Sequence, residues 1–177
     1  MPSTVRFRLD DDGAAALTAL RDRLAAAGIP VPAGTPHVTV AAAGTIPPTA
    51  VRELSAQLRL VALPVLWLAG LGSVGPDAPE VLALTAVTDP EVLAVHTAVH
   101  DALAGRVRGA HAAHAAHLPG SWLPHVVLAT GRPAEAFALL HPVSPVRARI
   151  TAVELHDSRT GETAVLGARP EGPARRP

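Results

Sequence analysis

The chain contains no cysteine and no lysine, and its formal net charge is zero. Without cysteine it can form no disulfide, no thiolate nucleophile and no thiolate metal site. Its 15 acidic residues balance 15 basic residues, all of them arginine, so the chain lacks the excess positive charge with which proteins bind long nucleic acids. A small substrate, or the terminus of a larger one, fits this composition better than an extended polymer.

Long uninterrupted hydrophobic runs are also missing. The most apolar stretch, residues 58–71, contains Arg59 and Pro64 and is too short to span a bilayer. Residues 1–12 mix arginines with aspartates and lack the apolar segment of a secretion signal. We therefore expect a cytoplasmic protein that contacts no membrane.

Enough apolar residues are present for one folded unit. The chain has 177 residues, of which 49% are hydrophobic, so we expect one domain over residues 1–168 and a disordered tail over residues 169–177. Period-two alternation predicts strands, and apolar residues spaced three and four apart predict helices. The expected strands lie near residues 4–9, 37–42, 60–68, 80–87, 125–129, 146–156 and 163–166, and the expected helices near 12–27, 48–58, 90–104 and 133–140. Their order predicts an α+β (α/β) fold, with Phe7 and Trp67 in the core.

A short Pro-His-Val segment occurs twice, at residues 36–38 and 124–126. Each segment opens a β-branched stretch, in which successive side chains point to opposite faces of the strand. His37 then shares a face with Thr39, and His125 shares a face with Val127. If the intervening valines pack against helices, both histidines project from the opposite faces of their sheets, and two such sheets enclose a cleft.

Two opposed imidazoles suit the cleavage of a phosphodiester. One can accept a proton from the attacking oxygen while the other donates a proton to the leaving oxygen, and histidine titrates near neutral pH. The Thr39 hydroxyl can donate to a phosphate oxygen, and by the same alternation Arg6 and Arg8 project toward the cleft as cationic donors. We therefore predict His37 and His125 as catalytic residues and the other three as substrate-binding residues, in a monomer that needs no metal and no cofactor.

With these motifs the chain resembles the two-histidine (2H) phosphoesterase superfamily, in its bacterial 2′-5′ RNA ligase and RNA 2′,3′-cyclic phosphodiesterase branch. Members of that superfamily carry two His-x-Thr/Ser motifs, one in each lobe of a pseudo-twofold structure, and residues 37–39 (His-Val-Thr) match the first motif in full. Trp122 takes the aromatic position before the second motif, where it either stacks on a nucleobase or closes the core.

The resemblance implies a bilobal fold, with two lobes of antiparallel sheet, outer helices and a central cleft. It also implies a metal-independent phosphodiesterase that opens a 2′,3′-cyclic phosphate. The substrate would be an RNA terminus or a small cyclic nucleotide, and the reverse reaction would be a 2′-5′ RNA ligation.

The second motif departs from the family pattern, because Val127 stands where the family has threonine or serine. The loss of one phosphate donor costs about 1–3 kcal/mol, which slows turnover roughly 10- to 200-fold without removing the acid–base chemistry. Thr130 has the wrong alternation to replace the missing hydroxyl, and Ser121 would have to reach the site from a loop. The alternative is therefore that the chain is a catalytically weakened or inactive member of this fold, which binds RNA or nucleotides.

Two further groups of histidines leave a metal hydrolase as a second alternative. His111, His114 and His117 form a tract in the connection over residues 105–120, but their spacing spreads the side chains around a helix and no carboxylate follows them. His96 and His100 are spaced for one face of a helix, yet the glutamate of a zinc-binding helix motif is missing. We interpret this pair as surface residues.

Overall fold

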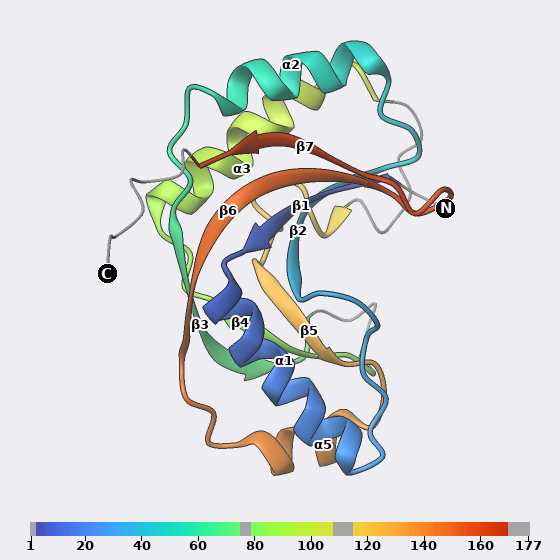
Figure 1. Ribbon diagram of the computed structural model, residues 1–177, viewed down its shortest axis with the longest axis vertical. Coiled ribbons are helices and arrows are strands. Elements are labelled where there is room, and N and C mark those ends of the chain that lie inside the picture. Colours follow the sequence, from blue (N-terminus) through green and yellow to red (C-terminus); the bar gives the residue numbers. More distant parts are fainter. Residues whose placement is uncertain (1–2, 75–78, 108–114, 170–177) are drawn as a thin grey trace, which may run out of the picture.

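The computed structural model describes residues 3–74, 79–107 and 115–169. Within these ranges the chain forms an antiparallel α+β fold of seven strands and four helices (Figure 1). In chain order they are β1 (Ser3–Leu9), α1 (Asp11–Ala26), β2 (His37–Ala43), α2 (Pro48–Leu58), β3 (Val65–Gly72), β4 (Leu82–Ala86), α3 (Pro90–Leu103), β5 (His125–Ala129), α5 (Pro133–Leu140), β6 (Val146–Asp157) and β7 (Thr163–Ala168). The predicted histidine tract falls within the described residues only at His117, and the predicted tail only at Arg169.

Local sequence signals explain where most elements begin. Helix α1 begins after Asp10, whose side chain accepts a hydrogen bond from the backbone N–H of Gly13, and α3 begins after Asp89, which caps Val92 in the same way. Strand β3 starts later than the predicted 60–68. Strand β3 lies between β4 and β6, where both sides of a strand form hydrogen bonds. Pro64 has no N–H to donate to such a ladder, so the strand begins at the next residue.

The strands form one sheet with the order β2-β1-β6-β3-β4-β5, and β7 pairs with β6 outside this path. Strand β6 is long enough to belong to both lobes. Its first part, from Val146 to Arg149, pairs with β3, and its later part pairs with β1 and β7. The lobes are therefore two parts of one continuous sheet, and not two separate sheets.

The helices are exchanged between the two parts of the sheet. Helices α2 and α3 cover the lobe that contains β1, β2 and β7, whereas α1 and α5 cover the lobe that contains β3, β4 and β5 (Figure 1). Helix α1 follows β1 in the chain but packs against β5 and β6. As a result, each lobe is built from segments of both halves of the sequence.

Strands β2 and β5 lie at the two ends of the sheet path, and yet they contact each other. The twist and curvature of the sheet bring its two edges together, so β2 and β5 run close to each other beside the central strands (Figure 1). The contact between these edges defines the place where the two Pro-His-Val segments meet.

The core confirms the predicted alternation of strand residues. Val38, Val40, Val126 and Leu128 have no exposed surface, while the residues between them are half-buried. Phe7 is fully buried, as predicted. The prediction for Trp67 was wrong.

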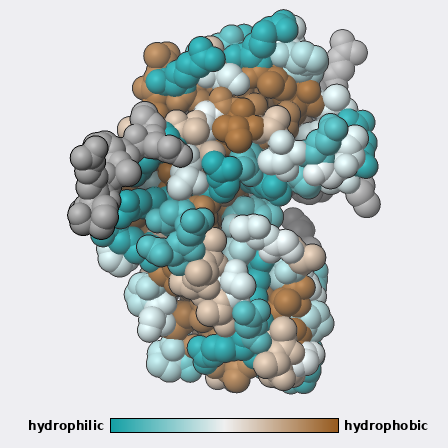
Figure 2. All heavy atoms as spheres, in the orientation of Figure 1, coloured by the Kyte–Doolittle hydropathy of each residue, from teal (hydrophilic) through white to brown (hydrophobic). Residues whose placement is uncertain are grey.

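Trp67 lies on β3 with half of its surface exposed, and the guanidinium of Arg147 lies 5.7 Å from the centroid of its ring. The next strand residues, Leu66 and Leu68, supply the buried face instead. On the face shown in Figure 2, hydrophilic and hydrophobic residues are interspersed, and hydrophilic residues gather between the two lobes.

Candidate active site

His37 and His125 line the same pocket, although they come from opposite edges of the sheet. His37 begins β2 and His125 begins β5, so each is the first residue of an edge strand. The pocket has a volume of about 260 Å³. The two imidazoles therefore share one groove, as the predicted acid–base chemistry requires.

The two imidazoles are held by equivalent hydrogen bonds. Nδ1 of His37 lies 3.0 Å from the carbonyl oxygen of Thr35, and Nδ1 of His125 lies 2.7 Å from that of Leu123. A carbonyl oxygen can only accept, so Nδ1 is the donor in both rings. In the neutral rings Nε2 is then the basic nitrogen, and in the protonated rings it is the acid.

The electrostatic surroundings of the two histidines differ. Burial lowers the pKa of His37 below its ordinary value, the hydrogen bond to Thr35 opposes this change, and the positive charges of Arg6 and Arg21 lower the pKa further. Burial also lowers the pKa of His125, again opposed by its backbone hydrogen bond, with no contribution from a charged neighbour among the described residues. His37 is therefore the imidazole with cationic neighbours.

Two threonine hydroxyl groups line the histidine pocket, one on β2 and one just after β5. Thr39 lines it beside His37, as predicted, and Val127 lines it beside His125. Thr130 lines it as well, although its alternation predicted that its hydroxyl does not directly replace the one missing at residue 127. It follows the end of β5, where regular alternation no longer applies.

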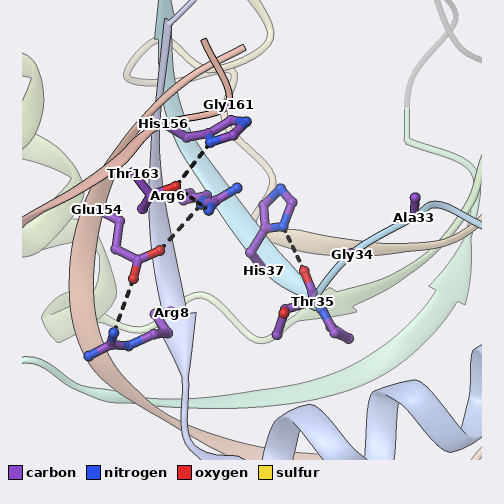
Figure 3. A pocket seen from close by; sticks show the side chains of 11 residues that line it. Arg6, Arg8, Ala33, Gly34, Thr35, His37, Glu154, His156, Gly161 and Thr163 are labelled. Carbon is purple, nitrogen blue, oxygen red and sulfur yellow. Dashed lines mark hydrogen bonds and ion pairs between the residues drawn. The ribbon is translucent and has the colours of Figure 1, made fainter.

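A second and larger pocket, of about 650 Å³, is also lined by His37 (Figure 3). The predicted residues Arg6 and Arg8 line it, together with His156 and Thr163. His37 belongs to both pockets, so one imidazole lies between them.

Glu154 connects the two arginines and was missed by the sequence argument. Its Oε2 lies 3.4 Å from Nε of Arg6, and its Oε1 lies 3.2 Å from Nη1 of Arg8 (Figure 3). The Arg6 Nη2 also donates to the Thr163 hydroxyl, at 3.1 Å. One buried carboxylate thus orients both cations and neutralises one of their two charges.

The second residue missed in this pocket is His156, whose Nδ1 lies 3.1 Å from the same Thr163 hydroxyl. Glu154 and His156 are two residues apart on β6, on the face opposite Val153, which is fully buried. Their alternation could have indicated a shared face, but not that this face meets His37.

Trp122 lies in the core, not in either pocket. The residue is 9% exposed, its ring stacks on that of His96 with centroids 4.1 Å apart, and its Nε1 donates to the carbonyl oxygen of Thr39 at 2.9 Å. Of the two alternatives, its burial and the ring face covered by His96 match the one in which Trp122 closes the core, and not the one in which it stacks on a nucleobase.

The interpretation of His96 and His100 as surface residues was wrong for His96, which is buried, and His100 is half-buried. His96 is only 2% exposed and lies 2.8 Å from the carbonyl oxygen of His117, and Nε2 of His100 lies 3.2 Å from that of Val40. His100 thus connects α3 to β2, whereas His96 packs against Trp122. The apolar residues beside them on α3 indicated burial, but the residue type argued against it.

Arg21 is a further residue of the histidine pocket that the sequence argument missed. It lies on α1 between Leu17 and Leu24, and it is 6% exposed. Its position in the apolar stripe of the helix was visible in the sequence, since residue 21 falls on the same face as residues 17 and 24.

Neither a metal site nor a membrane span is found in the described part of the chain. In residues 3–74, 79–107 and 115–169, no three histidine, aspartate or glutamate side chains are grouped to hold a metal ion. None of the helices in these ranges has the length and apolarity that crossing a bilayer demands. The described groups that can transfer protons at the pocket are the two imidazoles.

Comparisons with known proteins agree with this geometry. The 2′-5′ RNA ligase superfamily matches residues 9–162. The fold is similar to Usb1 of Kluyveromyces marxianus, with a TM-score of 0.56, 10% identity, and coverage of 94% of this chain and 97% of that one. It is also similar to E. coli LigT complexed with NADP+, with a TM-score of 0.50, 16% identity, and coverage of 96% of both chains.

No curated protein sequence matches the chain significantly. The family match, however, includes both histidine motifs and every element from α1 to β6. The chain therefore belongs to the 2′-5′ RNA ligase superfamily, the group of 2H phosphoesterases whose fold it shares.

Proposed function

We propose that the chain is a phosphodiesterase that opens 2′,3′-cyclic phosphates, at RNA termini or in small cyclic nucleotides, without a metal. The observation that carries this proposal is the shared pocket of His37 and His125, in which each Nδ1 is bound to a backbone carbonyl. This arrangement supplies one proton acceptor and one proton donor from two Nε2 atoms.

The charges around the two rings favour one division of roles. The cations near His37 favour its neutral form, which makes it the general base. Burial lowers the pKa of His125 as well, but no cationic neighbour among the described residues lowers it further, so we assign to His125 the role of general acid.

The reaction then follows from these roles. Nε2 of His37 takes a proton from water, and the water oxygen forms a bond to phosphorus. The bond from phosphorus to one ribose oxygen breaks, and that oxygen takes the proton from Nε2 of His125. Thr39 donates to a phosphate oxygen, and the products are a phosphomonoester and a free ribose hydroxyl.

The larger pocket offers space for the rest of the substrate. It begins at His37 and carries Arg6, Arg8 and one neutralising carboxylate, so it retains one net positive charge from these three groups. We assign to it the nucleotide portion next to the cyclic phosphate. The reverse reaction, a 2′-5′ RNA ligation, would use the same two imidazoles with their protonation states exchanged.

The experiment is a hydrolysis assay with the four nucleoside 2′,3′-cyclic monophosphates and an oligoribonucleotide that ends in a cyclic phosphate. We expect His37→Ala and His125→Ala each to lower kcat/KM by about 10² to 10⁴, as expected for the loss of a general acid or base. His141→Ala is the control, because His141 stacks on Phe137 and lines neither pocket.

Absence of turnover in the wild-type protein on every one of these substrates would contradict the proposal. If the wild-type protein then still bound nucleoside monophosphates, the alternative of a nucleotide-binding member without turnover would replace it. Val127 in place of a family hydroxyl is the observation that favours that alternative.

A further inference from the structure

Arg21 connects both histidine-bearing segments to α1. Its Nε and Nη2 donate to the carbonyl oxygen of Val127, at 3.1 and 2.8 Å, and its Nη1 donates to that of Gly34 at 2.9 Å. Val127 lies on β5 beside His125, and Gly34 lies in the segment that leads to His37. The guanidinium is therefore held from both sides while it lines their common pocket.

The charge of Arg21 has no anionic partner among the described residues. Both of its acceptors are neutral carbonyls, and none of the ion pairs formed by the described residues involves it. A buried charge without a partner is costly, and burial lowers the pKa of Arg21 accordingly. Arginine nevertheless stays protonated at neutral pH, so the pocket keeps a full positive charge.

Arg21 also has N–H groups that make no hydrogen bond to the described residues. A guanidinium has five N–H groups, and the three hydrogen bonds to Val127 and Gly34 leave one N–H on each Nη atom without a partner among the described residues. Arg6 and Arg8, by contrast, share the carboxylate of Glu154. Among the arginines of the two pockets, Arg21 is thus the one that has no carboxylate partner in the described part of the chain.

Arg21 lies next to the residue at which the second motif lacks a hydroxyl. Its guanidinium is bonded to the backbone of Val127, the residue that stands where the family has a hydroxyl donor. We propose that Arg21 is a catalytic residue that binds the phosphoryl group between His37 and His125 and replaces the hydroxyl missing at residue 127. This inference rests on the proposed function for the identity of the substrate, but it concerns a phosphate site that can be tested without turnover.

Two other roles compete with this one. Arg21 could serve only to join α1 to the two strands, and the Thr130 hydroxyl, which lines the same pocket, could be the replacement donor instead. The first role predicts a loss of stability without a specific effect on phosphate. The second predicts that Thr130→Val affects the reaction more than a change at Arg21 does.

The first test measures the binding of inorganic phosphate and of a nucleoside 2′-monophosphate by calorimetry, together with kcat/KM for a 2′,3′-cyclic nucleotide. We expect Arg21→Gln to weaken phosphate binding and lower kcat/KM by roughly 10²-fold, the range for the loss of one preorganised donor. Arg23→Gln is the matched control on the same helix, because Arg23 donates to Leu139 and does not line the histidine pocket.

A restored hydroxyl makes the test more specific. Val127→Thr should raise kcat/KM by about tenfold when Arg21 is Gln, and by clearly less when Arg21 is intact, because the two donors serve the same phosphate. Equal gains in both backgrounds would overturn the proposal. A larger loss in Thr130→Val than in Arg21→Gln would overturn it as well.

A measurement on the wild-type protein covers the case in which Arg21→Gln does not fold. With ¹⁵N-labelled arginine, the Nε–H resonance of Arg21 should shift on titration with inorganic phosphate, while that of Arg132, which pairs with Glu135 on the surface, should stay in place. An unchanged Arg21 resonance at saturating phosphate would overturn the inference.

The two proposals fail in distinguishable ways. Turnover that depends on His37 and His125, combined with phosphate binding that does not depend on Arg21, would remove the inference and leave the phosphodiesterase. Phosphate binding that depends on Arg21, in a protein that hydrolyses none of the cyclic substrates, would leave the site and remove the phosphodiesterase.

Discussion

The two imidazoles of the pocket have matching backbone partners but different charged neighbours. Both Nδ1 atoms donate to a carbonyl two residues earlier, so the local chain conformation fixes both tautomers in the same way. The charges of Arg6 and Arg21 lower the pKa of His37 but not that of His125. At the residue scale, the difference in charge between the two imidazoles therefore comes from residues of α1, β1 and β6, since His156 also lowers the pKa of His37.

This asymmetry predicts a response of the pH profile to a change at Arg6. The profile of kcat/KM should be bell-shaped, with the acid limb set by the base His37 and the alkaline limb by the acid His125. Because the charge of Arg6 lowers the pKa of His37, Arg6→Gln should raise that pKa and move the acid limb to higher pH.

The alkaline limb should remain in place in the same variant, and Arg147→Gln, which alters a cation over Trp67 outside both pockets, should move neither limb. The measurement is kcat/KM for one cyclic nucleotide between about pH 4.5 and 9, a range that includes histidine titration. A shift of the alkaline limb alone would reverse the assigned roles of the two histidines.

Helix α1 contributes one buried side chain to the histidine pocket. It carries Arg21, and its first turn packs closely on β6, because a Cβ at Gly13 would lie 2.5 Å from the Cβ of Ala148 and 2.9 Å from its Cα. Glycine is required there for the close approach of helix and sheet, although alanine is the better helix former.

We therefore predict that Gly13→Ala destabilises the protein by about 1–3 kcal/mol, the usual cost of overpacking. Gly72→Ala, on β3, is the matched control, since nothing lies within 4 Å of its added Cβ and the expected change is within about 0.5 kcal/mol. Urea unfolding measures both variants. Equal stabilities would show that α1 tolerates a shift away from β6.

The whole molecule brings together segments that are distant in the chain, and buried or half-buried histidines lie where these segments meet. His37 and His125 lie where the sheet edges meet, and His96 lies between α3 and Trp122. Burial is the largest cause that lowers the pKa of each of the three below the ordinary 6.5.

A lowered histidine pKa gives stability a definite dependence on pH. The unfolded chain binds more protons than the folded protein as the pH falls below about 6.5, so the free energy of unfolding should decrease from there until the folded-state pKa values are reached. Asp157 acts in a separate window, because Arg159 lowers its pKa from 3.8 to about 2. Urea unfolding at about pH 7.5 and 5.5 therefore isolates the histidines.

His96→Gln should reduce this loss of stability on acidification, because it removes one of the three titrating groups. The comparison is the difference in unfolding free energy between the two pH values, in the variant and in the wild type. Equal unfolding free energies of the wild-type protein at both pH values would contradict the prediction.

Local patterns in the sequence determined the strands, the capped helices and the faces of the motif residues. Alternation placed His37 and Thr39 on one face and Val38 on the other, and the structure agrees, because the pleat of a strand depends only on neighbouring residues. The capped starts of α1 and α3 were equally local, since a cap acts within one turn.

Only the tertiary structure decided that the two edges of the sheet meet. Pairing in the order β2-β1-β6-β3-β4-β5, and the curvature that closes it, depend on contacts between residues far apart in the chain, which no local pattern encodes. The same long-range packing brought Arg21 from α1 to Val127 and placed Glu154 between two arginines. Sequence periodicity could select the faces of these residues, but their partners follow from the way the sheet twists and the helices exchange lobes.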